Sequence, residues 1–164
     1  MSVTLTTDQF NELLNNMKSK KNNQEIDLTE LKNKRTEALN FSDFMDIFDY
    51  ISIVKILNVN TDDYIYDTII HNLDKLEKDE YPFIHINGTF YFKNNNEWSK
   101  STDFIKEIVF KVFSFVSKQL INWKHNDEKL AITSRFYNPE RYPLAKLRNT
   151  LLNRLTKNVK INYF

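Results

Sequence analysis

The single glycine of the chain, Gly88, is the residue that most restricts what this sequence can fold into. It follows Asn87 and separates two runs of bulky residues, 83–86 and 89–92. Asn-Gly is typical of two-residue type I′ turns, because both central residues of that turn need a positive φ. The stretch therefore predicts a β-hairpin at residues 83–92. We expect its aromatic side chains to pack on the core and not to form an exposed, DNA-contacting wing.

Outside this stretch, apolar residues recur at the three- and four-residue spacing of amphipathic helices. The segments with this spacing, after an N-terminal one, are residues 26–39, 40–58, 62–80, 103–123, 127–136 and 143–155. With aromatic residues at 14% and apolar residues at 41%, the chain has the composition of a globular protein with its own core. The predicted fold class is mainly α with a small β-hairpin (α+β), a compact helical domain of five to seven helices.

Three expectations concern where elements begin and end. Residues 40–58 are expected to form one continuous helix, with Ser42 as its N-cap and Phe44 on its apolar face. Residues 93–102 are expected to form a loop. The alternating residues 159–164 are expected to form a last short strand beside the hairpin.

Two further expectations concern burial. The helix at 103–123 is expected to be buried on most sides, because Phe104, Phe113 and Phe115 widen its apolar face. In the helix at 143–155 the inner stripe is expected to consist of Leu144, Leu147, Leu151 and Leu155.

The N-terminal segment, residues 1–18, is predicted to form an amphipathic helix that is separable from the rest. Thr6 and Gln9 have the capping-box spacing. The narrow apolar stripe of this helix consists of Phe10, Leu13, Leu14 and Met17. Residues 19–25 form a polar linker, and residues 26–164 form the helical domain. The stripe is the candidate protein-binding site, because amphipathic helices dock into apolar grooves.

The sequence has no pattern typical of a catalytic or metal centre. It contains no cysteine, and one glycine is too few for a phosphate-binding loop or a nucleophile elbow. The spacing of three acidic residues is that of a solvent-exposed helix N-terminus, where the helix dipole favours negative charge; they are Asp43, Asp46 and Asp49. The histidines lie on separate predicted elements; they are His71, His85 and His125. We therefore expect no enzyme activity, no metal and no cofactor.

Charge is unevenly distributed along the chain although the net charge is only +1. Residues 41–80 hold ten acids and three bases, whereas residues 128–164 hold eight bases and two acids. Bases interleaved with aromatic residues suit phosphates and nucleobases. The candidate nucleic-acid contacts are Lys146, Arg148, Arg154 and Lys157. Alternatively, the acidic segment neutralises this basic third within one chain or between two chains.

Residues 90–123, "FYFKNNNEWSKSTDFIKEIVFKVFSFVSKQLINW", with "NTLLNRLTKNVKINYF" at the end of the chain, show an ordered pattern. A Tyr-Lys strand, a tryptophan, an acidic step, a long helix ending in tryptophan and a basic helix follow one another. This pattern resembles a C-terminal region of uncharacterised proteins of large nucleocytoplasmic DNA viruses, over residues 83–164. The many asparagine, lysine, isoleucine and phenylalanine residues agree with an AT-rich genome. The resemblance implies a viral protein and brings no catalytic residue.

These observations predict a non-enzymatic intracellular protein-interaction module, a viral structural or assembly component that self-associates, as a homo-oligomer, or binds a partner protein. Because no secretory signal or membrane-spanning stretch is found, we expect the host cytoplasm, the nucleus or the virion, with no membrane contact. Two alternatives stay open: a nucleic-acid-binding accessory module, and an inhibitor directed at a host or other enzyme.

Overall fold

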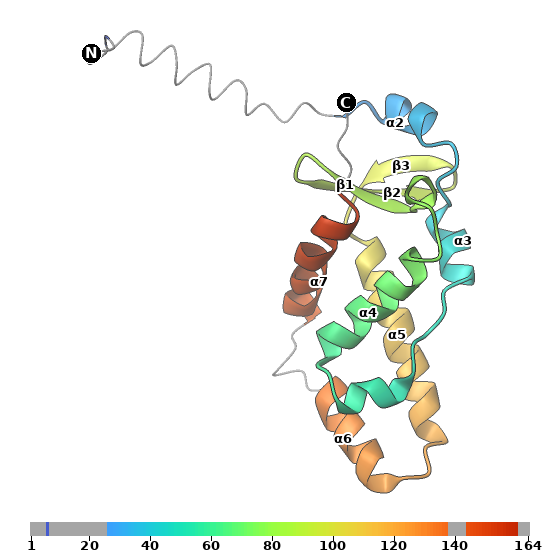
Figure 1. Cartoon of the computed structure of the whole chain (residues 1–164), viewed down its shortest axis with the longest axis vertical. Coiled ribbons are helices and arrows are strands. Elements are labelled where there is room, and N and C mark those ends of the chain that lie inside the picture. The colour runs from blue at the N-terminus through green and yellow to red at the C-terminus, as the bar shows by residue number, and fades with distance from the viewer. Residues whose placement is uncertain (1–5, 7–25, 138–143, 161–164) are drawn as a thin grey trace.

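The computed structural model describes Thr6, residues 26–137 and residues 144–160. The helices are α2 (Leu28–Lys34), α3 (Phe41–Asp46), η1 (Ile53–Leu57, 3-10), α4 (Thr61–Leu73), η2 (Lys78–Glu80, 3-10), α5 (Phe104–Ile121), α6 (Asn126–Phe136) and α7 (Leu144–Asn158). The strands are β1 (Phe83–Ile86), β2 (Thr89–Asn94) and β3 (Glu97–Lys100). Figure 1 shows the sheet at one end with α4, α5 and α7 extending from it and α6 at the far end. The predicted mainly helical α+β class is confirmed.

The predicted hairpin is present, and its turn has the predicted geometry. β1 and β2 pair antiparallel, with Phe83 opposite Phe92 and Ile86 opposite Thr89. The φ angles are 48° at Asn87 and 82° at Gly88. No heavy atom lies within 4 Å of the position that a Cβ would take at Gly88, so the glycine is needed for its backbone conformation and not for space.

The expected loop at residues 93–102 is wrong, because this stretch contains a second hairpin. β2 continues to Asn94 and pairs antiparallel with β3. The turn is formed by Asn95 and Asn96, whose φ angles are 49° and 61°. Asparagine tolerates positive φ better than other non-glycine residues, so an Asn-Asn pair can serve where Asn-Gly is the stronger signal. Trp98 is consequently a buried strand residue.

The expected continuous helix at residues 40–58 is also wrong. Helix α3 ends at Asp46, and helical structure resumes only in the 3-10 helix η1. The N-cap of α3 is Asn40 and not Ser42. The side chains of Ile47 and Val54, which a continuous helix would place on the same face as Phe44, are exposed.

A buried asparagine on α4 explains the break in this helix. The backbone N–H of Asp49 donates a hydrogen bond to Oδ1 of Asn72 (2.8 Å), and Nδ2 of Asn72 donates to the carbonyl oxygen of Asp49 (2.8 Å). These bonds from a residue far along the chain satisfy the backbone groups that a continued helix would pair locally. The amphipathic spacing is therefore real, but a tertiary contact overrides it.

The buried apolar residues form one cluster that extends from Leu31 in α2 to Val159 after α7. Phe104, at the start of α5, lies at the centre of its aromatic part. Its ring stacks on Phe83 at 4.5 Å between centroids and contacts Phe90 at 5.8 Å. Phe41 of α3 and Phe92 of β2 each lie at 6.2 Å from it. This cluster joins the sheet to α3 and α5.

Helix α5 buries one face only, so the expectation that it is buried on most sides is wrong. Phe110 is 79% exposed and Ile121 is 74% exposed. On α7 the predicted inner stripe is confirmed for Leu147, Leu151 and Leu155, but Leu144 is 60% exposed.

The chain after α7 reaches the hairpin, but of the strand expected at 159–164 only one isolated bridge is described. The backbone N–H of His85 donates to the carbonyl oxygen of Val159 (2.9 Å), and His85 forms a parallel bridge with Lys160. Residues 161–164 lie outside the described residues. So do the predicted N-terminal helix and the linker at 19–25, apart from Thr6.

We predict that Phe104→Ala lowers the free energy of unfolding by about 3–5 kcal/mol, because it removes a buried ring and leaves a cavity. Ile121→Ala, on the exposed side of the same helix, is the control and should change it by less than about 0.5 kcal/mol. Urea unfolding followed by circular dichroism measures both. Equal losses in the two variants would show that the aromatic cluster does not hold the sheet on α5.

Candidate protein-binding groove

An apolar groove lies along the outward face of α5, near the start of α7. Its volume is about 790 Å³. It is lined by Lys106, Glu107, Val109, Phe110, Lys111, Phe113, Ser114 and Leu144. We call this the α5 groove.

The groove exists because α5 carries apolar residues on two sides. The inner side is buried against the sheet and the other helices through residues such as Ile105, Ile108 and Val112. Lys106, Phe110 and Ser114 follow one another at four-residue spacing on the outward side. Phe110 is 79% exposed and lies near the exposed Leu144 and the half-buried Phe113, so the exposed apolar side chains are grouped here and not scattered singly.

One wall of the groove is held in place by aromatic packing. The ring of Phe113 lies 4.6 Å from that of Phe136 and 5.5 Å from that of Tyr137, between centroids. The hydroxyl of Tyr137 donates to the carbonyl oxygen of Phe113 (3.1 Å), and a hydrogen bond joins it to the hydroxyl of Ser117. The end of α6 therefore fixes this wall before anything binds.

The rim of the groove is charged, but its charges are used in local contacts. The ammonium of Lys106 pairs with the carboxylate of Asp103 at 2.8 Å. Hydrogen bonding to Lys106, then to Ser101, holds the pKa of Asp103 below its ordinary value. The ammonium of Lys111 donates to the backbone carbonyl of Met45. An apolar floor with a polar rim suits docking of apolar side chains, and no reactive groups converge there.

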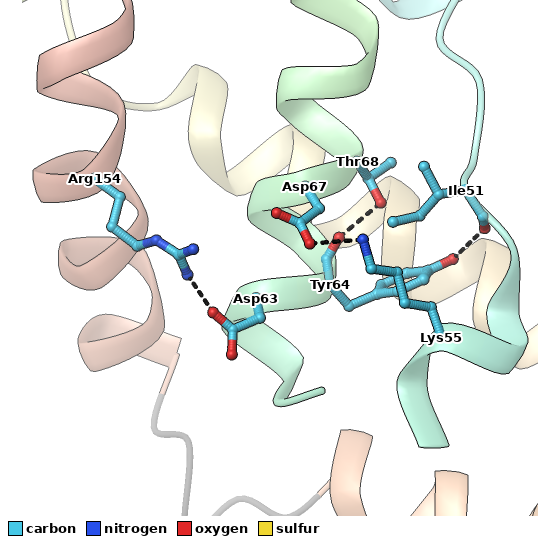
Figure 2. Close-up of polar contacts among 7 residues, drawn as sticks. All are labelled: Ile51, Lys55, Asp63, Tyr64, Asp67, Thr68 and Arg154. Carbon is cyan, nitrogen blue, oxygen red and sulfur yellow. Dashed lines mark hydrogen bonds and ion pairs between the residues drawn. The ribbon is translucent and has the colours of Figure 1, made fainter. Parts of the chain in front are cut away.

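The four predicted nucleic-acid contacts do not form one basic surface, because Arg154 is paired within the chain. Its guanidinium lies 2.9 Å from the carboxylate of Asp63 and 3.6 Å from that of Asp62. It also lies over the ring of Tyr66, 3.9 Å from the centroid. Figure 2 shows Arg154 reaching from α7 to Asp63 on α4. The acidic start of α4 thus neutralises this residue internally, one of the two alternatives left open by the sequence.

The other three basic residues differ in how far their charges are free to contact a phosphate. Lys146 and Lys157 are exposed and form no ion pair with any described residue. Eleven residues are close to three helical turns, so both lie on one face of α7, about 16 Å apart. Arg148 is half-buried, its Nε has no hydrogen-bond partner among the described residues, and its charge helps to lower the pKa of Asp103.

The polar contacts around α4 hold the helices together. The hydroxyl of Tyr64 donates to the carbonyl oxygen of Ile51 (2.8 Å). The hydroxyl of Thr68 donates to the carbonyl oxygen of Tyr64 (2.7 Å). Lys55 of η1 pairs with Asp67 at 2.8 Å, as Figure 2 shows. Burial raises the pKa of Tyr64 to about 12, so its phenol stays protonated near neutral pH. The Lys55–Asp67 pair connects η1 to α4, and the Tyr64–Ile51 bond connects the residues just before η1 to the same helix.

The described part of the chain contains no group of three or more side chains able to hold a metal ion. None of its helices is long and apolar enough to cross a bilayer. Asp43, Asp46 and Asp49 do not share one helix start, since α3 ends at Asp46. His85 is half-buried in β1, and its pKa is lowered, first by burial and also by Lys160, against the opposing effect of a hydrogen bond with the Gly88 backbone.

Sequence reasoning placed the protein-binding site at Phe10, Leu13, Leu14 and Met17, all of which lie outside the described residues. It missed the α5 groove. The available signal was Phe110, an apolar residue that lies among the polar positions of its helix. From the sequence, Phe110 could not be distinguished from a buried core residue, because the other apolar residues of the helix suggested that it is buried on most sides.

Comparisons with known proteins identify no relative: no family model, no curated protein and no solved structure matches this chain. The geometry and chemistry of the described residues therefore carry the functional interpretation. The viral resemblance stays a prediction.

We predict that the free energy of unfolding falls as the pH drops below about 6.5, the ordinary pKa of histidine. The lowered pKa of folded His85 means that the unfolded chain binds this proton more readily, so acidification favours unfolding until the folded imidazole is also protonated. His85→Gln should remove this part of the decline, whereas His125→Gln, at an exposed position, should keep it. Urea unfolding between pH 7.5 and 5 measures the effect. Parallel profiles for the wild type and His85→Gln would contradict it.

Proposed function

We propose that this protein is a non-enzymatic interaction module that acts by associating with itself, as a structural or assembly component. The observation that carries the proposal is the α5 groove, where Phe110 and Leu144 expose apolar surface beside a wall fixed by Phe113. Exposed apolar surface of this kind marks protein contacts. Most soluble oligomers are assemblies of identical chains, which favours self-association over capture of a different protein.

The N-terminal stripe supplies the second half of the proposal. Phe10, Leu13, Leu14 and Met17 have the i, i+3, i+4, i+7 spacing by which amphipathic helices engage grooves. The sequence predicts a polar linker at 19–25 between this stripe and the helical domain, which would let the stripe reach beyond its own domain. In this proposal a chain presents both an apolar stripe and an apolar groove.

We place this module inside infected cells or in the particle of a large DNA virus. The support is the pattern shared by residues 83–164 with viral C-terminal regions, together with the codon bias that the composition suggests. Absence of cysteine agrees with a reducing compartment.

Leu13→Asp combined with Leu14→Asp is predicted to dissociate the oligomer, because two buried carboxylates without partners oppose docking of the stripe. Size exclusion with light scattering measures the mass. Asn11→Asp with Asn15→Asp adds the same two charges on the polar face of the predicted helix and should leave the mass unchanged. A Leu13→Asp, Leu14→Asp chain that keeps the mass of the wild type, or a wild type that is monomeric, contradicts self-association through the stripe.

A second candidate function, binding of nucleic acid, is favoured by the two exposed lysines on one face of α7. With Arg154 paired to Asp63, the contact would depend on Lys146 and Lys157. Two phosphate contacts give a weak interaction whose affinity falls with salt at a logarithmic slope of only about −2.

We predict for this candidate that Lys146→Gln with Lys157→Gln lowers the salt concentration that elutes the protein from heparin. Lys118→Gln with Lys124→Gln is a matched control at exposed lysines away from α7. A wild-type protein that heparin does not retain at low salt excludes this function. Equal shifts in the two double variants would show that only overall charge matters.

A further inference from the structure

We propose that the α5 groove receives the stripe of Phe10, Leu13, Leu14 and Met17 from a second copy of the chain, so that each copy is both donor and acceptor. This inference rests on the proposed self-association and names the surface that it uses. The stripe and the groove then form a reciprocal contact between two identical chains.

The two surfaces match in length and in chemistry. From Phe10 to Met17 the predicted helix rises about 10 Å, and from Lys106 to Ser114 helix α5 rises about 12 Å. The apolar residues with which α5 lines the groove are Val109, Phe110 and Phe113. Four apolar side chains over two helical turns are what a groove of about 790 Å³ can accept.

The position of α2 favours a second copy as the donor. Figure 1 shows α2 beside the sheet on the side away from α7, which supplies Leu144 to the groove. α2 packs on β3, and the described chain before it begins at Ile26. The linker at 19–25 spans at most about 25 Å when extended. A stripe that stayed on its own chain would have to reach the groove from Ile26 within this length, and the cross-linking experiment below distinguishes that case from a second copy.

The area required for a stable dimer also favours reciprocal exchange. One short helix in one groove buries less than the roughly 800 Å² per partner that specific interfaces bury. Exchange between two chains makes the same contact twice and leaves neither groove open. The exposed Phe110 is then covered in both copies.

The test uses full-length chains and the absence of natural cysteine, which makes introduced thiols unique. Leu13→Cys and Phe110→Cys chains are mixed and oxidised mildly. We expect a disulfide-linked dimer on non-reducing gels, because a docked stripe brings the two Cα atoms within the 4.4–6.8 Å that a disulfide needs. Leu13→Cys mixed with Ile121→Cys is the control, since Ile121 is equally exposed on α5 but outside the groove. At least ten-fold more dimer than in the control supports the proposal.

Phe110→Asp gives an independent measurement. Because Phe110 is exposed, this variant should unfold at the same urea concentration as the wild type at dilutions where both are monomeric, yet fail to dimerise. Mixing it with the Leu13→Asp, Leu14→Asp chain leaves one of the two reciprocal contacts intact, so we expect a dimer that forms only at higher protein concentration than the wild-type dimer.

The outcomes separate this inference from the proposed function. If cross-linking is no greater than in the control and the Phe110→Asp protein still dimerises, the α5 groove is not the acceptor and this inference is wrong. The proposed self-association through the stripe still holds in that case if the Leu13→Asp, Leu14→Asp chain is monomeric. If a chain that carries both Leu13→Cys and Phe110→Cys forms the disulfide only within one chain, the stripe binds the groove of its own chain. That result overturns the claim that the donor is a second copy. A Phe110→Cys thiol that stays unreactive in the Leu13→Asp, Leu14→Asp background, where no stripe can dock, shows a groove filled by another part of the chain, which also overturns the proposal.

Discussion

The packing of the Phe104 ring against the sheet is the contact on which the rest of the structure depends. A small antiparallel sheet has little stability of its own and needs a partner surface for its apolar face. Phe104 supplies that surface by stacking on Phe83 and by contacting Phe90 and Phe92. Since Phe104 is also the first residue of α5, the same contact sets the direction and rotation of that helix. The outward position of Phe110, and hence the α5 groove, follows from this rotation.

Polar contacts from α4 decide what the rest of the surface can do. Asn72 ends the helical path near Asp49, and Arg154 is drawn onto Asp63. The first contact shapes the connection between α3 and η1. The second removes one cation from the basic third of the chain and leaves α7 with Lys146 and Lys157 exposed. The described surface therefore offers an apolar groove more clearly than a phosphate-binding face, which is why self-association is the leading proposal.

The accuracy of sequence reasoning differed between elements for identifiable reasons. The turn at Asn87 and Gly88 was predictable because its requirement for positive φ is local and Asn-Gly meets it strongly. The turn at Asn95 and Asn96 has similar φ angles but a weaker signal, and the second hairpin was missed. The error at residues 40–58 has another origin: the spacing was helical, and Asn72, far along the chain, supplied competing hydrogen bonds.

By itself, the sequence determined the mainly α class, the first hairpin and most of the inner stripe of α7, because these depend on local turn chemistry and on the period of apolar residues. It also determined that one glycine and no cysteine leave few routes to common catalytic sites. Only the tertiary structure decided that Phe110 and Leu144 face outward together and that Arg154 is paired. Periodicity shows which residues share a face of one helix. Which faces find a neighbour, and which stay open, depends on contacts between segments far apart in the chain.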